Sequence, residues 1–496
     1  MKKLGKIRQK AFLYFSCIPL MLICSGFTSP LYPHYIGLDC SVFLIMAKGI
    51  TNGKIPYIDL FDHKGPIFYL METIGYLFGG RTGVFFFQCV LLILDLFIID
   101  RIFELFNAGF LVATVSFLSL FFTLFQHGNL TEEFSTPLIL AIVYYELKFL
   151  LSKNEKHSLF AAYFYGIILG LLAFIRVNNA IVPCALLLCI VIILIHKNQW
   201  SNLLGNIISG LLGLVTVTFP ICFYYYRHNA LYDLLYATFL YNLIYAKNNT
   251  HYPIMSSFLY YLVLFMPGIC AIVIFYTKWK IERNRAYSSL LFTTVMTYGM
   301  LAYTNVYIHY FVLGIPLFVI SVAAVGSNSS IVEIWDNRAV PYFRELCKII
   351  SDLGVIHILT VSVVVIYIGL SAVSVCPAIY KTYLTDVAYD EYKQIQTGAS
   401  VIPEDERDSV IAFNVLANYY YHADINPCYK YFTLQNWFTT EKVNVHDEFM
   451  QYLINEHPLW VVIQDDETDI TLNKILEINY SCQLSDGTYS YYRYNN

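Results

Sequence analysis

Apolar runs long enough to span a bilayer recur from residue 11 to residue 376, with short polar segments between them. A membrane-spanning helix needs about 20 mainly apolar residues. The pattern therefore predicts eleven membrane-spanning helices, at residues 11–27, 82–100, 109–126, 134–151, 158–175, 179–196, 203–226, 256–277, 287–304, 307–325 and 354–376. Composition indicates the same class, because only 13% of the 496 residues are charged, against about 25% in soluble domains. The chain is predicted to be an all-α polytopic membrane protein over most of its length.

The apolar segment at residues 67–80 is predicted not to cross the membrane. Its sequence, IFYLMETIGYLFGG, is short for a span and contains Glu72, which favours an amphipathic helix at the membrane surface. A crossing here would place the basic clusters at 148–156 and 278–285 outside, against the positive-inside rule.

The basic N-terminus lacks a small-residue cleavage site. We therefore expect an uncleaved first span, a cytoplasmic N-terminus and an external C-terminal region.

Residues 377–496 are polar, contain no apolar span and have many more acidic than basic residues. DSVIAF and LWVVIQD are typical of strands, and HDEFMQYLINEHP is typical of a helix. The final residues predict a hairpin that turns at Asp486-Gly487. We expect a transmembrane domain at 1–376, with a first external loop at 28–81, and a small extracytoplasmic α/β domain at 377–496. Two cysteines of this outer domain, Cys428 and Cys482, could pair in an oxidising compartment.

Ionisable and polar residues gather at the predicted outer ends of four elements. They are Asp39, Asp62, His63 and Lys64 in the first external loop, Glu132 and Glu133 after the third span, Arg176 at the end of the fifth, and His309 and Tyr310 at the start of the tenth. Charged groups at membrane depth normally face partners or water. The pattern therefore predicts a shared cavity at the outer face of the membrane.

Each of these residues also has a purely structural explanation. Asp39 could cap the helix that follows it, and the acidic pair at 132–133 would be favoured at a helix N-terminus. Lys64 could extend towards lipid headgroups, and Arg176 could anchor its helix at the interface. His309 could be an ordinary interface histidine. The grouping of the residues, rather than any one of them, indicates a site.

Four stretches of the chain resemble the GT-C superfamily of membrane glycosyltransferases: GLDCSVFLIMAKGITNGKIPYIDLFDHKGPIFYL, LTEEF, IRVNN and YIHYFVLGIP. The branch most similar to this chain contains protein O-mannosyltransferases and aminoarabinose transferases, many of them bacterial. Its pattern has an acid early in the first external loop, then Gly-x-x-Pro-Tyr and Lys-(Gly/Pro)-Pro elements and an interfacial helix. Here these elements are Asp39, 53–57 and 64–66.

The chain departs from this pattern at two places. Some members carry two adjacent acids at the first position, whereas Asp39 is followed by Cys40. Others have an Asp-x-Asp-like second motif that helps to hold a metal, whereas this chain has Glu132-Glu133. The resemblance therefore does not firmly imply a cofactor. Whether the protein depends on a divalent metal stays open.

The resemblance implies a sugar donor linked to polyprenyl phosphate, with a glycan, lipid or protein as acceptor, in a bacterial inner (plasma) membrane. A carboxylate can remove the acceptor proton as the new bond forms, and Asp39 is the candidate base, with inversion at the anomeric carbon. Cationic groups stabilise the departing phosphate, which suits Lys64 and Arg176 with His63. The candidate substrate-binding residues are Asp62, Glu132, Glu133, His309 and Tyr310.

Two other membrane functions stay open. A transporter or flippase for lipid-linked sugars would carry charges at the bilayer midplane, and Asp95 is the residue that would suit it. A polymerase or ligase for lipid-linked glycans would carry Arg-rich external loops, where this chain has acidic motifs. Membrane lipids are expected partners. The membrane class and the acidic outer domain argue against a nucleic-acid partner.

Overall fold

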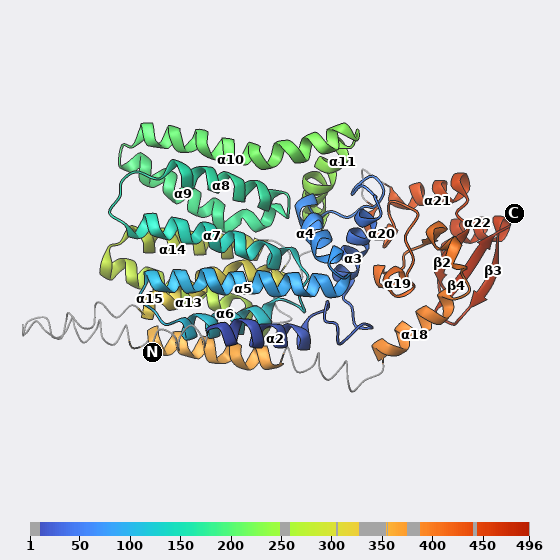
Figure 1. Cartoon of the computed structure of the whole chain (residues 1–496), viewed down its shortest axis with the longest axis horizontal. Helices are drawn as coiled ribbons and strands as arrows, with labels where there is room; N and C mark the ends of the chain where they lie inside the picture. The colour runs from blue at the N-terminus through green and yellow to red at the C-terminus, as the bar shows by residue number, and fades with distance from the viewer. Residues whose placement is uncertain are drawn as a thin grey trace, which may run out of the picture. The chain divides into compact units, whose positions relative to one another are not determined.

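The computed structural model describes residues 10–248, 258–303, 306–326, 354, 356–373, 387–439 and 444–495. The chain forms two compact units (Figure 1). Unit 1 comprises Met1–Met21, Gln88–Tyr224 and Asn248–Pro377, and unit 2 comprises Leu22–Phe87, Tyr225–Lys247 and Ala378–Asn496. The predicted domain boundary at 376–377 and the outer ends of three predicted spans, at 256–257, 304 and 374–376, lie outside the described residues.

Unit 1 is a bundle of apolar helices that run side by side in Figure 1. Its helices, some of which continue into unit 2, are η1 (Leu13–Cys17), α2 (Ile18–Ser25), α5 (Arg81–Leu105), α6 (Phe110–Leu124), α7 (Thr131–Leu151), α8 (Leu159–Ala173), η2 (Val177–Ala180), α9 (Ile181–His196), α10 (Trp200–Arg227), α13 (Phe258–Glu282), α14 (Arg285–Tyr303), η5 (Ile308–Gly314), α15 (Ile315–Gly326) and a helix at 356–373. The predicted class, a largely helical protein with apolar helices, is confirmed.

Seven helices of the described chain are long and apolar enough to cross a membrane. They are Arg81–Leu105, Thr131–Leu151, Val177–His196, Trp200–Arg227, Tyr260–Glu282, Ile308–Gly326 and Ile356–Val373. The other four predicted segments fall on α14 and on three shorter apolar helices, Lys10–Ser25, Phe110–Leu124 and Leu159–Ala173. Each of the eleven segments is therefore mainly helical over the residues that the structure describes, whereas the number that crosses the membrane stays a prediction.

The helices of unit 1 differ in how much of their apolar surface is buried. Within the most apolar 18-residue stretch of each helix, 94% is buried in Ile308–Gly326 and only 6% in Trp200–Arg227. A helix that is apolar all round belongs in a core or in a membrane. Ile308–Gly326 is therefore enclosed by neighbouring parts of the protein, and α10 presents apolar side chains on the outside, where lipid would cover them.

Unit 2 contains the first external loop, a short helical segment and the C-terminal region. Its helices are α3 (Leu38–Thr51), α4 (Pro66–Leu77), α11 (Leu231–Leu235), η3 (Tyr236–Leu240), α12 (Tyr241–Asn248), α18 (Val387–Ala399), η7 (Glu404–Ser409), α19 (Ala417–His422), α20 (Gln435–Phe438), α21 (Val445–Glu456) and α22 (Ile470–Asn479). The helix expected at 67–80 is thus present as α4, which begins at Pro66, where proline is favoured in the first turn. Its place at the membrane surface stays a prediction.

The C-terminal region contains a four-stranded sheet. Its strands, β1 (Val410–Ala412), β2 (Trp460–Gln464), β3 (Tyr480–Ser485) and β4 (Tyr489–Tyr494), have the spatial order β1-β2-β4-β3. β1 pairs parallel to β2, and the other pairs are antiparallel. The predicted strands, helix and hairpin are confirmed, and Gly487 takes the positive φ (+88°) that the turn requires. Cys428 and Cys482 are both free thiols.

Contacts within unit 2 join the C-terminal region to the first external loop. Lys48 Nζ lies 2.7 Å from Asp424 Oδ1, and the backbone N–H of Phe61 donates to the Lys430 carbonyl at 2.8 Å. Lys430 also pairs with Asp233 at 3.1 Å. The first loop, the 225–247 segment and the C-terminal region therefore fold against one another.

Candidate functional site

In unit 2, Asp62, His63 and Lys64 form a buried charged cluster. Lys64 Nζ lies 3.7 Å from Asp62 Oδ1 and 3.1 Å from His63 Nε2, and His63 Nδ1 lies 3.1 Å from Asp62 Oδ1. Because the ammonium can only donate, Nε2 accepts from Lys64 and the imidazole proton sits on Nδ1, facing Asp62. The three residues are only 3–8% exposed, so their charges are largely shielded from water.

Aromatic hydroxyls fix this cluster in place. Tyr69 donates to Asp62 Oδ2 at 2.5 Å, and the hydroxyl of Tyr57 donates to the Lys64 carbonyl at 2.7 Å. Tyr57 is fully buried and has a positive φ of 72°, a conformation uncommon for a residue with a side chain. The Gly-x-x-Pro-Tyr element of the sequence is therefore a tight turn that brings its tyrosine under Lys64.

The electrostatics of the cluster favour a charged Asp62. Burial alone would raise the pKa of this carboxyl, but the charges of Lys64 and His63 and hydrogen bonds from His63 and Tyr69 outweigh it and hold the pKa well below its usual range. Asp62 is therefore ionised at neutral pH and offsets the charge of Lys64. The Lys64 ammonium also lies 5.4 Å from the centre of the Phe43 ring, a cation–π distance.

Residues that sequence reasoning missed surround His63. Asn242 Nδ2 donates to the His63 carbonyl at 2.9 Å, and the Tyr241 ring centre lies 5.4 Å from that of His63. Trp437 lies 6.0 Å from His63 by the same measure and is 45% exposed. No local sequence signal could have placed Trp437 here, because it belongs to the C-terminal region.

Asp39 lies in the first turn of α3 and is exposed. Gly37 occupies the N-cap position and no side chain caps the helix, so Asp39 does not serve as the cap. Among the described residues, no other side chain forms a hydrogen bond or ion pair with its carboxylate, and none links it to the cluster at 62–64. The Asp39 carboxylate is therefore open to a reactant.

In unit 1, Arg176 lies against Glu132 and Tyr310. Its Nη1 is 3.0 Å from Glu132 Oε1, its Nη2 donates to the Tyr310 hydroxyl, and the guanidinium lies 4.5 Å from the centre of the Tyr310 ring. The three residues come from the segment before η2, the first turn of α7 and η5. The structure thus brings together three of the predicted site residues. His309 contacts the edge of Tyr310 at 4.6 Å between ring centres and pairs with Gln126 at 2.5 Å.

Glu133 has different partners from Glu132. Its Oε2 accepts from Gln88 Nε2 and from the backbone N–H of Asn129, both at 2.8 Å. Successive helical residues point about 100° apart, which explains why the two acids separate. Asp95 follows Gln88 by two turns of α5 and is buried, and in the described part of the chain neither carboxylate oxygen has a hydrogen-bond partner.

The part of the chain that the structure describes contains no group of three or more His, Cys, Asp or Glu side chains that could hold a metal ion.

Comparison with known proteins finds similarity at the level of the fold. No protein-family model matches the chain, and no curated protein matches it. The structure is similar to ArnT from Cupriavidus metallidurans bound to undecaprenyl phosphate, with a TM-score of 0.62 at 10% identity over 98% of each chain. The apo state of ArnT gives 0.62 at 12% identity over 99% of this chain and 98% of that one.

An archaeal enzyme is similar over a smaller share of its length. The Archaeoglobus fulgidus oligosaccharyltransferase, tethered to an acceptor peptide, gives a TM-score of 0.51 at 11% identity, over 98% of this chain and 74% of that one. ArnT and this oligosaccharyltransferase are both GT-C superfamily members. The resemblance predicted from four stretches of the sequence is confirmed at the level of the fold: this chain has the fold of ArnT and of this oligosaccharyltransferase.

Proposed function

We propose that this protein transfers a sugar from a polyprenyl-phosphate-linked donor to a glycan, lipid or protein acceptor at the outer face of a bacterial plasma membrane. The observation that carries the proposal is the fold similarity to ArnT bound to undecaprenyl phosphate, which extends over 98% of both chains. Buried cationic groups at Lys64 and Arg176 add the chemistry that a lipid phosphate requires.

Asp39 is the proposed general base. Removal of the acceptor proton needs a carboxylate that can contact the nucleophile directly. The Asp39 carboxylate is exposed, and no other described side chain pairs with it, which supports this role. Direct attack by the activated acceptor, with no covalent intermediate, would invert the anomeric carbon.

Arg176 and Lys64 are the proposed phosphate-binding groups, with His63. Glu132 and Tyr310 hold the Arg176 guanidinium by an ion pair and by a stacked ring, which fixes the orientation of a planar group suited to two-point phosphate contact. Asp62 places the Lys64 ammonium and keeps the buried charge compensated. Each of these cations would thus need little rearrangement to contact a phosphate.

Trp437 is the proposed sugar platform. Its indole is 45% exposed beside His63, and an exposed aromatic face offers apolar contact to the C–H face of a sugar ring. The Gln435 side chain fixes the short helix α20, which carries Trp437: its Nε2 donates to the carbonyls of Ala412 and Tyr431, and its Oε1 accepts from the Asn414 N–H. Asp62, Glu132, Glu133, His309 and Tyr310 remain the proposed substrate-binding and supporting residues.

A transporter or flippase is the second candidate, and Asp95 is the observation that favours it. A buried membrane carboxylate without a hydrogen-bond partner in the described chain is typical of ion and substrate pathways. A polymerase or ligase for lipid-linked glycans is a third candidate, although the external loops carry acids in place of an Arg-rich set.

Reconstitution in vesicles tests the proposal. The full-length protein would be given undecaprenyl phosphate carrying mannose, glucose or aminoarabinose, together with a membrane extract of the source bacterium as acceptor. A glycosyltransferase of this kind releases undecaprenyl phosphate in proportion to labelled product, whereas a flippase moves the donor intact. Release of undecaprenyl diphosphate from an oligosaccharide donor would indicate a polymerase or ligase instead.

A further inference from the structure

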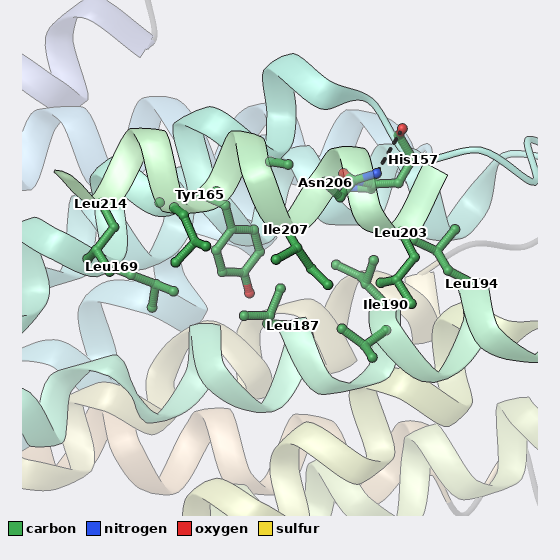
Figure 2. A pocket seen from close by; sticks show the side chains of 15 residues that line it. His157, Tyr165, Leu169, Leu187, Ile190, Leu194, Leu203, Asn206, Ile207 and Leu214 are labelled. Carbon is green, nitrogen blue, oxygen red and sulfur yellow. Dashed lines mark hydrogen bonds between the residues drawn. The ribbon is translucent and has the colours of Figure 1, made fainter. Parts of the chain in front are cut away.

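An apolar pocket of about 230 Å³ lies within unit 1 between α8, α9 and α10 (Figure 2). Side chains from all three helices line it, among them Leu169, Leu187, Ile190, Leu203, Ile207 and Leu214. None of the predicted site residues lines this pocket. The pocket therefore shares no lining residue with the proposed sugar-transfer site.

Two glycines determine how α8 and α10 meet around the pocket. A Cβ on Gly166 would lie 1.9 Å from the Gly210 carbonyl oxygen, so the two backbones touch at this point. A Cβ on Gly210 would meet nothing closer than the Ala162 carbonyl oxygen at 3.5 Å. The helices are therefore held close while Gly210, which lines the pocket, leaves space unfilled.

His157 and Asn206 contribute the polar groups at one end of the pocket, as Figure 2 shows. His157 Nδ1 lies 2.6 Å from Asn206 Oδ1, and Nε2 lies 3.1 Å from Glu146 Oε2. The backbone N–H of His157 donates to Asn202 at 2.8 Å. Because both ring nitrogens already have protein partners, this end offers little polarity to an occupant, and the pocket suits an apolar chain.

Three exposed lysines flank the same end of the helices. Lys153 and Lys156 lie in the loop before His157, and Lys197 follows the end of α9, close in sequence to Leu194 of the pocket. Lys197 pairs with Glu155 at 3.3 Å, which joins the two loops. With three lysines and a single exposed acid, these loops carry net positive charge, and basic groups at helix ends attract anionic lipid headgroups.

The pocket opens to the outside of the helix bundle. Two of its lining residues, Ile207 and Leu187, are 48% and 36% exposed. In α10, only 6% of the most apolar 18-residue stretch is buried. The volume lies below the ~300–1,000 Å³ of pockets that enclose drug-sized ligands. It therefore fits a segment of one hydrocarbon chain, rather than a whole lipid or a folded polyprenyl chain.

We propose that this pocket holds one acyl chain of an anionic phospholipid, whose headgroup contacts Lys153, Lys156 and Lys197. The acyl chain fills the apolar pocket between α8, α9 and α10, and the lysines select the charge of the headgroup. This site is independent of the proposed sugar transfer, and its test needs no transferase activity.

Photolabelling of the full-length protein in vesicles tests the proposal. The probe is phosphatidylglycerol with a diazirine on one acyl chain, diluted in phosphatidylcholine, and labelled peptides are mapped by mass spectrometry. We expect labelling at α9 and α10 residues of the pocket to fall at least fivefold in Ile207→Trp, which fills the space. The matched control is Ile208→Trp, an exposed neighbour that does not line the pocket and should label as the wild type does.

The headgroup part is tested with Lys153→Gln, Lys156→Gln and Lys197→Gln combined. We expect this variant to label equally with the phosphatidylglycerol and phosphatidylcholine probes, whereas the wild type prefers phosphatidylglycerol. Equal labelling of Ile207→Trp and Ile208→Trp would overturn the pocket. No preference for phosphatidylglycerol in the wild type would overturn the anionic headgroup, and stronger labelling of the pocket by photoactivatable undecaprenyl phosphate would overturn the phospholipid.

Discussion

Arg176 and Glu132 form a buried ion pair, with Nη1 and Oε1 3.0 Å apart and both side chains at most 10% exposed. Removal of one partner of such a pair leaves the other charge uncompensated and typically costs about 3–5 kcal/mol. The pair therefore has two separable consequences, one for stability and one for the proposed binding of phosphate.

Arg176→Ala should lower both thermal stability and affinity for undecaprenyl phosphate. The double variant Arg176→Ala/Glu132→Gln should regain much of the stability, because no buried charge is left unpaired, but should not regain affinity. Arg176→Lys should bind with intermediate affinity, since it keeps the charge and loses the planar fork. Thermal unfolding and lipid binding in detergent measure the two effects. Normal undecaprenyl phosphate affinity in Arg176→Ala would exclude the phosphate role.

Asp39→Asn should reduce sugar transfer by about 10²–10⁴-fold, the usual contribution of a general base. The fold should be unaffected, because the side chain is exposed and does not cap α3. The matched control is Asp390→Asn, since Asp390 is also an exposed acid in the first turn of a helix, α18. Initial rates with saturating donor provide the measurement. Equal activity in the two variants would show that Asp39 is not the base.

Loss of the negative charge of Asp62 should make the protein less stable in acid. The pKa of Asp62 is depressed in the folded protein, so its stabilising contribution is complete above the unfolded pKa of about 3.9. That contribution is lost as the pH falls below this value towards the folded pKa. Asp62→Asn should destabilise the protein at pH 7 by about 3–5 kcal/mol, because Lys64 then stays buried without its counter-charge.

The measurement for Asp62 is thermal unfolding of the wild type and Asp62→Asn between pH 3 and pH 7. The difference between them should stay nearly constant from pH 7 down to the unfolded pKa of about 3.9 and shrink below it. A second variant, Asp62→Asn/Lys64→Met, should be more stable at pH 7 than Asp62→Asn alone. A constant difference across the whole pH range would contradict the charged state of Asp62.

Trp437→Ala should weaken binding of glycosylated undecaprenyl phosphates while leaving binding of bare undecaprenyl phosphate unchanged. The reason is that the exposed indole would contact the sugar and not the lipid phosphate. An aromatic contact of this kind contributes about 0.5–1.5 kcal/mol, which corresponds to a change in Kd of roughly two- to tenfold. Trp437→Phe should retain most of the affinity. Equal loss for bare and glycosylated lipids would instead indicate a structural role.

The sequence by itself determined the features that depend on local pattern. Apolar run length located all eleven helical segments, and the short apolar run at 67–80 located α4. Alternation and turn residues located β1, β2 and the hairpin at Gly487. These properties are local because hydropathy, proline geometry and positive φ act over a few neighbouring residues. The first external loop also carried enough pattern for the superfamily resemblance.

Only the tertiary structure decided which side chains meet. No sequence pattern separates Glu132, which pairs with Arg176, from its neighbour Glu133, which pairs with Gln88. No sequence pattern brings Trp437 to His63 either. Such contacts join residues far apart in the chain, and they depend on how packed helices and loops orient each side chain rather than on the residues beside it.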